Sequence, residues 1–193
     1  MTLKTKHPAT YADIEALPIA WVGEILDDTL YAHRRATIGH ANVETVLGTL
    51  LTDAFGLART GPGGWWILIE PELHFGKDVF VPDLVAWRKE RLPKRPEPHE
   101  PWMTVVPDWV CEILSPSTNR LDRARKLPKY HRLGVQHAWL IDPVARTLEV
   151  LERAQRGWLN TENFAGEEPV RAPPFDDVPL ELRRLWLGSD DGP

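Results

Sequence analysis

The chain has almost no cysteine and no long apolar segment, and these absences exclude several classes of protein. Its 193 residues contain one cysteine, Cys111, so an internal disulfide and a cysteine-built zinc or iron–sulfur centre are excluded. No apolar run approaches the roughly 20 residues that a membrane-spanning helix needs. No basic segment followed by an apolar one stands near residue 1, and we therefore expect a cytoplasmic protein with no membrane partner.

Basic residues are outnumbered over the whole chain but concentrated in one segment. The 28 acidic and 23 basic residues give a net charge of −5, which argues against a protein that coats nucleic acid. Residues 120–132, however, hold six Lys or Arg and one acid, whereas residues 149–193 hold ten acids and five bases. The basic segment suits a phosphate-bearing polymer, although a charge run is more often a solvated helix face.

The apolar pattern predicts a single α/β (α+β) domain over residues 1–193. Residues 1–35 form a lead-in of a short helix and two extended pieces around a turn at Asp27-Asp28. Residues 36–152 form a core, and residues 153–193 an acidic hairpin with a short final helix. Within the core we expect a helix over 37–55, extended segments over 65–70, 73–75, 79–87 and 109–114, a basic helix from 119 to 133, and strands over 137–142 and 147–152. This order predicts a mixed central β-sheet flanked by helices, with additional β-hairpins.

Two acidic residues lie in segments that otherwise have the composition of buried strands. Asp83 lies in the segment 79–87, where strand alternation places it on the same face as Val85, and Glu112 lies in the apolar run 109–114. An ionised carboxylate buried without a partner costs several kcal/mol, so each acid needs a cation, a proton or several donors. For either acid alone, pairing with a separate arginine is the simpler interpretation. If the two strands are neighbours, both acids converge on one hard cation such as Mg²⁺.

Several short segments around these acids resemble those of one known family. They are Pro82-Asp83, Cys-Glu112-Ile-Leu-Ser-Pro-Ser-Thr118, Leu-Asp122-Arg-Ala-Arg-Lys126-Leu-Pro-Lys-Tyr130, Gly134-Val135 and Ala-Trp139-Leu-Ile-Asp142-Pro143. Together they resemble the Uma2 family, which is grouped with the PD-(D/E)XK superfamily of nucleases that includes restriction enzymes. The resemblance extends from about Tyr11 to Phe175.

The resemblance implies a restriction-endonuclease-like core and hydrolysis of DNA phosphodiester bonds with Mg²⁺ or Mn²⁺. It makes Asp83 and Glu112 catalytic acids that hold the metal together with the backbone carbonyl of Ile113. The commonest form of the superfamily has a lysine two residues after the second acid, where this chain has a leucine. The catalytic lysine is therefore assigned to Lys126 on the following helix, with Lys129 as the alternative.

Further roles follow from the same resemblance. Glu72 is either a third metal ligand or a structural residue, and Tyr130 orients the site or packs beneath it. Contacts to the DNA backbone are assigned to Arg120, Arg123, Arg125 and Lys129. Relatives of this kind often dimerise, so we expect a homodimer and no small-molecule organic cofactor. The alternative function is an inactive or repurposed nuclease fold that binds nucleic acid or protein.

Three other features have ordinary structural interpretations. His40 and Glu44 are one turn apart on the predicted helix 37–55, a spacing that is routine on helix faces. Pro128, two residues after Lys126, predicts a kink in the basic helix. The tryptophans favour packing over stacking on nucleic-acid bases.

Overall fold

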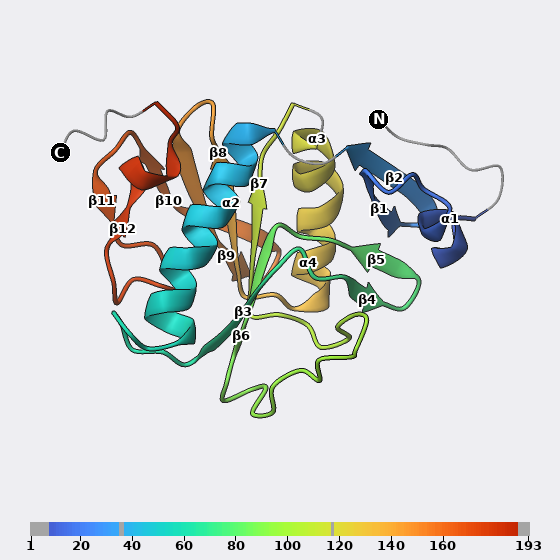
Figure 1. The fold of residues 1–193 in the computed structure, drawn as a ribbon, viewed down its shortest axis with the longest axis horizontal. Coiled ribbons are helices and arrows are strands. Elements are labelled where there is room, and N and C mark those ends of the chain that lie inside the picture. The colour runs from blue at the N-terminus through green and yellow to red at the C-terminus, as the bar shows by residue number, and fades with distance from the viewer. Residues whose placement is uncertain (1–7, 35–36, 117, 189–193) are drawn as a thin grey trace.

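The computed structural model describes residues 8–34, 37–116 and 118–188 (Figure 1). Its helices are α1 (Tyr11–Glu15), α2 (Ile38–Leu51), α3 (Asn119–Leu121) and α4 (Leu127–Leu133), with π-helical turns at Thr52–Gly56 and Asp122–Lys126 and a 3-10 turn at Leu182–Leu185. Its strands are β1 (Trp21–Leu26), β2 (Thr29–Arg34), β3 (Trp65–Ile69), β4 (Leu73–Phe75), β5 (Asp78–Phe80), β6 (Leu84–Arg88), β7 (Trp109–Ile113), β8 (His137–Asp142), β9 (Thr147–Ala154), β10 (Gly157–Ala165), β11 (Pro169–Val170) and β12 (Leu180–Glu181). None of the helices in these ranges is long and apolar enough to cross a membrane.

A six-stranded mixed sheet forms the centre of the molecule, in the order β10-β9-β8-β7-β6-β3. β7 and β8 are parallel, and every other neighbouring pair in this sheet is antiparallel. Parallel neighbours need a long crossover, which the helical segment from α3 to α4 provides. The mixed sheet flanked by helices that the sequence predicts is confirmed (Figure 1).

Side chains alternate along the central strands into two separate cores. Cys111 of β7 packs in the core beneath α2 and the C-terminal segment, whereas Val110 packs in the core beneath α4. Figure 1 shows α2 and α4 on either side of β7. Trp87, Trp109 and Trp139 are fully buried, so the packing interpretation is confirmed for these three tryptophans. β7 is buried on both faces, and any polar side chain on it needs a specific partner.

The segment 79–87 is not one strand, as the sequence predicts, but two strands in different sheets. β5 belongs to a four-stranded sheet in the order β2-β1-β5-β4, and β6 belongs to the central sheet. Pro82 lies between the two strands. Because a proline cannot donate a hydrogen bond to a sheet ladder, it interrupts the strand at this point. Asp83 therefore follows no strand alternation. It hydrogen-bonds to α2 while Val85 packs in the opposite core, so the predicted shared face is wrong.

The basic helix is interrupted where Pro128 predicts a kink. The Leu127 N–H donates to the Asp122 carbonyl across a wide π turn, so Pro128 falls in the first turn of α4, where a missing N–H costs little. Gly134, with φ +100°, ends α4 at the predicted residue. The π turn keeps the segment helical and leaves Lys126 buried.

The β1–β2 hairpin forms around Asp27 and Asp28, as the sequence predicts. Both residues have positive φ, which is the conformation of a two-residue hairpin turn. Lys129 of α4 joins this turn to the helix, because its Nζ lies 2.6 Å from Asp27 Oδ1 and 2.5 Å from Asp78 Oδ2. The hairpin is thereby attached to α4 and forms one wall of the cavity described below.

We predict that acidification destabilises the protein through His137 of β8. Burial lowers the pKa of His137 below its usual 6.5, and its Nδ1 is buried without a partner among the described residues. Because the unfolded chain then binds a proton more readily, the stability that neutral His137 contributes is present above pH 6.5 and is lost as the pH falls. Urea denaturation between pH 5 and 7.5 should show a smaller acid-induced loss for His137→Gln than for wild type. His99→Gln, in an exposed loop, is the control, and identical pH profiles for wild type and His137→Gln would contradict the prediction.

Candidate functional site

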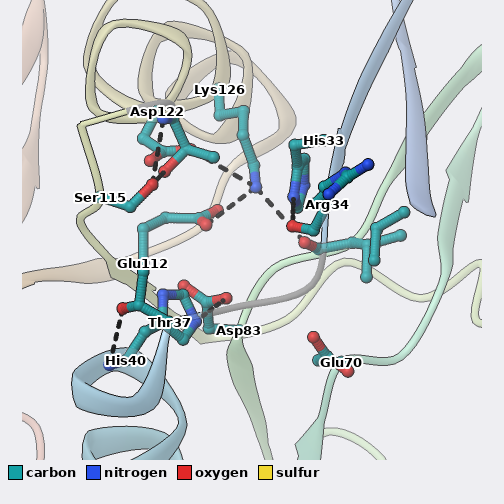
Figure 2. Close-up of a pocket in the computed structure, with 13 residues that line it drawn as sticks. His33, Arg34, Thr37, His40, Glu70, Asp83, Glu112, Ser115, Asp122 and Lys126 are labelled. Atoms are coloured by element: carbon teal, nitrogen blue, oxygen red, sulfur yellow. Dashed lines mark hydrogen bonds and ion pairs between the residues drawn. The ribbon is translucent and has the colours of Figure 1, made fainter. Parts of the chain in front are cut away.

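A small cavity of about 60 Å³ lies where β7 ends, beside the first turn of α2 and the β1–β2 hairpin (Figure 2). It is lined by Val22, His33, Arg34, Thr37, His40, Glu70, Val81, Asp83, Glu112, Ser115, Thr118, Asp122 and Lys126. The three residues expected to be catalytic, Asp83, Glu112 and Lys126, are all in this lining. The structure therefore brings them together from the turn before β6, the end of β7 and the helix that follows it.

Glu112 and Lys126 form a buried ion pair at the inner end of the cavity. The Lys126 Nζ lies 2.8 Å from Glu112 Oε2, and both side chains are 3% exposed. The Tyr130 hydroxyl donates to the other oxygen of Glu112 at 2.7 Å. Burial lowers the pKa of Lys126, but the negative charges of Glu112 and Glu24 outweigh burial and raise it well above the usual value. Lys126 therefore remains charged, and both oxygens of Glu112 have partners.

Two further carboxylates approach Lys126. Glu24 of β1 lies 2.9 Å from Nζ and Asp122 lies 3.7 Å from it. Burial raises the pKa of Asp122 to about 7, against the opposing charge of Lys126. Sequence reasoning missed Glu24, although the available signal was the one that singled out Glu112: an acid inside an apolar strand.

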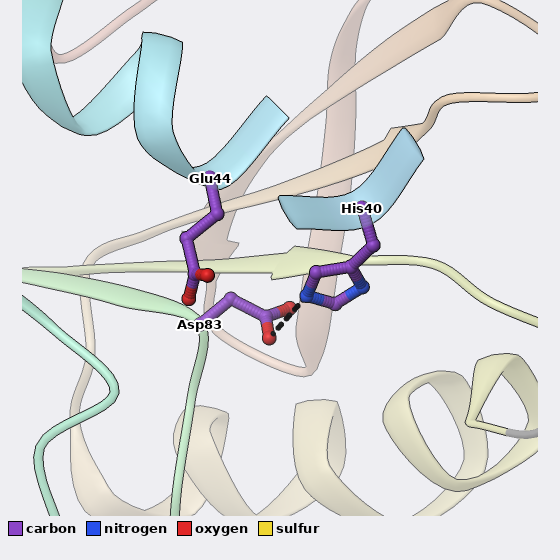
Figure 3. Close-up of side chains that lie close together, drawn as sticks. All are labelled: His40, Glu44 and Asp83. Atoms are coloured by element: carbon purple, nitrogen blue, oxygen red, sulfur yellow. Dashed lines mark hydrogen bonds and ion pairs between the residues drawn. The ribbon is translucent and has the colours of Figure 1, made fainter. Parts of the chain in front are cut away.

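A second cluster joins Asp83 to two residues of α2 (Figure 3). The Asp83 Oδ1 is hydrogen-bonded to His40 Nε2 at 2.9 Å, and Asp83 Oδ2 accepts from the Ile113 backbone N–H. Glu44 completes the group: one potential ligand atom from each of His40, Glu44 and Asp83 lies within 4.8 Å of the others. Sequence reasoning treated His40 and Glu44 as an ordinary helix-face pair; in the structure His40 is buried and hydrogen-bonded to Asp83.

Burial and the close acidic groups of this cluster shift the pKa values of Glu44 and His40. Burial raises the pKa of Glu44 to about 7, with the charges of Glu70 and Asp83 adding to the effect. Burial lowers the pKa of His40, but the hydrogen bond and charge of Asp83 outweigh it, so the net shift is upward. The Glu44 Oε1 is buried and has no hydrogen-bond partner among the described residues. One carboxylate oxygen of the cluster therefore lacks a donor among the described residues.

Glu72 lies outside the cavity lining. Its carboxylate accepts from the Tyr11 hydroxyl and is hydrogen-bonded to His74 Nε2, both at 3.0 Å, and the His74 ring stacks on Trp102. Glu70, two residues earlier and directly after β3, lines the cavity instead. Glu72 thus connects Tyr11 of α1 to His74 of β4.

The basic residues assigned to DNA contact have different environments. Arg120 and Arg125 are exposed, whereas Arg123 pairs with Glu149. Lys129 is buried and bonded to the β1–β2 hairpin, so it does not approach Glu112. Arg34 of β2 is an exposed cation in the cavity lining that sequence reasoning did not single out.

Comparison with known proteins identifies the family. The family model Uma2, described as "Putative restriction endonuclease", matches residues 12–183. The chain belongs to the Uma2 family. A solved structure with the same fold is "a putative nuclease belonging to DUF820 from Anabaena variabilis ATCC 29413", with a TM-score of 0.69 and 22% identity, covering 92% of this chain and 97% of that one. No curated protein matches the chain. The resemblance inferred from the residues around Asp83 and Glu112 is therefore confirmed.

We predict that Tyr130 stabilises this Uma2 protein by satisfying Glu112. Tyr130→Phe removes the donor to a buried carboxylate oxygen, and an unsatisfied buried acceptor costs about 2 kcal/mol. The free energy of unfolding from urea titrations should fall by that amount. Tyr31→Phe is the matched control, because no hydrogen bond of the Tyr31 hydroxyl occurs in the part of the chain that the structure describes. Equal losses in the two variants would argue against the prediction.

Proposed function

We propose that this Uma2 protein is a metal-dependent endonuclease that hydrolyses phosphodiester bonds of DNA. The observation that carries the proposal is that the Lys126–Glu112 ion pair lines the same cavity as His40 and Asp83, which form the second cluster together with Glu44. The first offers a fixed positive charge, and the second offers ligands for a cation. The family description and the nuclease fold of the solved relative support the same class of reaction.

The second cluster fits a divalent cation. Its carboxylate oxygens are ligands typical of Mg²⁺ and Mn²⁺, and the imidazole favours a transition-metal ion such as Mn²⁺. The unpartnered, buried Glu44 Oε1 is the atom that a cation would satisfy. We assign His40, Glu44 and Asp83 as the holding residues. Glu112 lines the same cavity, but its two oxygens are bonded to Lys126 and Tyr130.

The metal ligands, Lys126 and the exposed arginines have different roles in the proposed hydrolysis of phosphodiester bonds. A divalent ion, when bound, lowers the pKa of a water ligand and neutralises charge on the scissile phosphate. Lys126 supplies a preorganised positive charge for the negative charge that develops on the phosphate, or orients the attacking water. Arg34 at the cavity, with Arg120 and Arg125 on the helix, would contact backbone phosphates without reading sequence.

The proposal includes a homodimer that cuts both strands. Among the described residues, β3 is an outer strand of the central sheet, and an outer strand offers unpaired backbone groups through which two copies can associate. Sedimentation equilibrium of the wild-type protein tests this part separately from activity.

The alternative is a nuclease fold that binds nucleic acid or another protein without cleaving. The net charge of −5 is the observation that favours it. DNA binding without cleavage in Mg²⁺ or Mn²⁺ would support this alternative.

We expect Lys126→Ala to lose cleavage while retaining DNA binding. Removal of one preorganised charge in an active site typically lowers the rate at least about 100-fold. The assay is nicking of supercoiled plasmid with Mn²⁺ or Mg²⁺, with EDTA as the blank and gel-shift titration for affinity. Lys77→Ala, a change to an exposed lysine in the β4–β5 turn, is the control and should cleave normally. Full activity of Lys126→Ala would remove this lysine from the mechanism.

We expect Glu44→Gln and Asp83→Asn to weaken Mn²⁺ binding at least tenfold in calorimetric titrations without DNA. Each change removes a negatively charged ligand from the cluster. Glu162→Gln, on the exposed face of β10, should bind Mn²⁺ as wild type does. If Glu44→Gln binds normally and Glu112→Gln does not, the ion belongs with Asp83, Glu112 and the Ile113 carbonyl instead.

A further inference from the structure

The buried carboxylate of Glu24 contacts Lys126 and the Val81 backbone, two residues that line the cavity. Its Oε1 lies 2.9 Å from the Lys126 Nζ and accepts a hydrogen bond from the Val81 N–H, also at 2.9 Å. Val81 is two residues before Asp83, in the segment that crosses from one sheet to the other. One side chain of the β1–β2 hairpin is therefore bonded both to the candidate catalytic lysine and to the chain that carries the candidate metal ligand.

We propose that Glu24 is a positioning residue for Lys126, an inference that rests on the proposed function. An ammonium group has three N–H donors. The Lys126 Nζ donates to Glu112 Oε2 at 2.8 Å and to the Val81 carbonyl at 3.4 Å, and it forms an ion pair with Glu24 Oε1 at 2.9 Å. With Glu24 present the ammonium is held between two carboxylates and a carbonyl, and its direction is fixed. Without Glu24 one of these three contacts is lost, and the ammonium can turn away from the cavity.

Charge balance argues against a role for Glu24 in neutralisation alone. Glu112 already pairs with Lys126, and Asp122 adds a second acid at 3.7 Å. A further carboxylate that is 1% exposed carries a large desolvation penalty, which the Coulombic gain of a buried ion pair often does not exceed. His33 Nε2, at 4.0 Å from Glu24 Oε2, is the other titratable group that faces it. Positioning of the Lys126 ammonium therefore accounts for a buried carboxylate at residue 24 better than charge neutralisation does.

Contacts on both sides of the β1–β2 hairpin fix the strand from which Glu24 extends toward Lys126. Lys129 ties the hairpin turn to α4, and Ile25 pairs with Val79 to join β1 to β5. Glu24 thus extends from a strand fixed at both sides, which is the support that a preorganised side chain needs.

The test uses four full-length variants: Glu24→Ala, Glu24→Gln, Lys126→Met and Ile25→Val. Proton–nitrogen NMR spectra of the lysine side chains should contain a slowly exchanging ammonium signal from Lys126, identified by its absence in Lys126→Met and distinct from that of the buried Lys129. We expect this signal to disappear in Glu24→Ala and to persist, shifted, in Glu24→Gln, because glutamine retains an acceptor oxygen. Ile25→Val is a conservative core change in the same strand and should leave the signal unchanged.

Cleavage provides the second measurement. In single-turnover plasmid nicking, Glu24→Ala should be at least tenfold slower than wild type at unchanged DNA affinity, and Glu24→Gln should recover part of the loss. A Glu24→Ala protein that keeps the Lys126 signal and cleaves like Ile25→Val overturns the inference. If Glu24→Ala does not fold, an unchanged signal and rate in Glu24→Gln overturn it.

The two proposals fail in different ways. If the wild-type protein cleaves no DNA under any metal condition, the proposed function fails, and the NMR signal alone decides the role of Glu24. Loss of the Lys126 signal in Glu24→Ala but not in Ile25→Val then still supports positioning, and its persistence overturns positioning.

Discussion

The buried ammonium of Lys126 is the charge around which this end of the molecule is organised. A lysine with 3% of its side chain exposed is stable only where acceptors replace the water that it has lost. Glu112 from β7 and Glu24 from the β1–β2 hairpin supply them, and Tyr130 satisfies the remaining oxygen of Glu112. The central sheet, the smaller sheet and the basic helix therefore meet at one ion-paired centre. In the proposed nuclease site, the positive charge of Lys126 is therefore held in place by contacts that the fold itself requires.

The cluster of Asp83, His40 and Glu44 depends on the point where the chain passes from the smaller sheet to the central sheet. Pro82 separates β5 from β6, and the freed residue Asp83 turns toward α2 instead of joining a strand face. There it meets His40 and Glu44, whose spacing of one helical turn places both on the same side of α2. The Thr37 side chain accepts from the His40 N–H and so fixes where α2 begins. A loop residue and a helix face thus form the proposed cation site, which neither contains alone.

Two lysines of the basic helix, Lys126 and Lys129, have different partners because of the local helix geometry and of contacts with other segments. Lys126 and Lys129 are three positions apart, and their sequence context does not distinguish them. The π turn over Asp122–Lys126 accommodates Pro128 and directs Lys126 to Glu112, whereas Lys129 pairs with Asp27 and Asp78. The division depends on where the hairpin lies, because the hairpin turn provides the partners of Lys129.

The sequence by itself determined the mixed sheet, the hairpin turn at Asp27–Asp28, the end of α4 at Gly134 and the family, because these follow from local apolar periodicity, turn chemistry and short motifs. It also singled out Asp83, Glu112 and Lys126 as the residues to examine. Only the tertiary structure decided which side chains these residues contact. It pairs Glu24 with Lys126, places His40 and Glu44 beside Asp83, and leaves Glu72 outside the cavity lining. Those choices depend on contacts between segments far apart in the chain, and the packing of sheets and helices, not the neighbouring residues, sets such contacts.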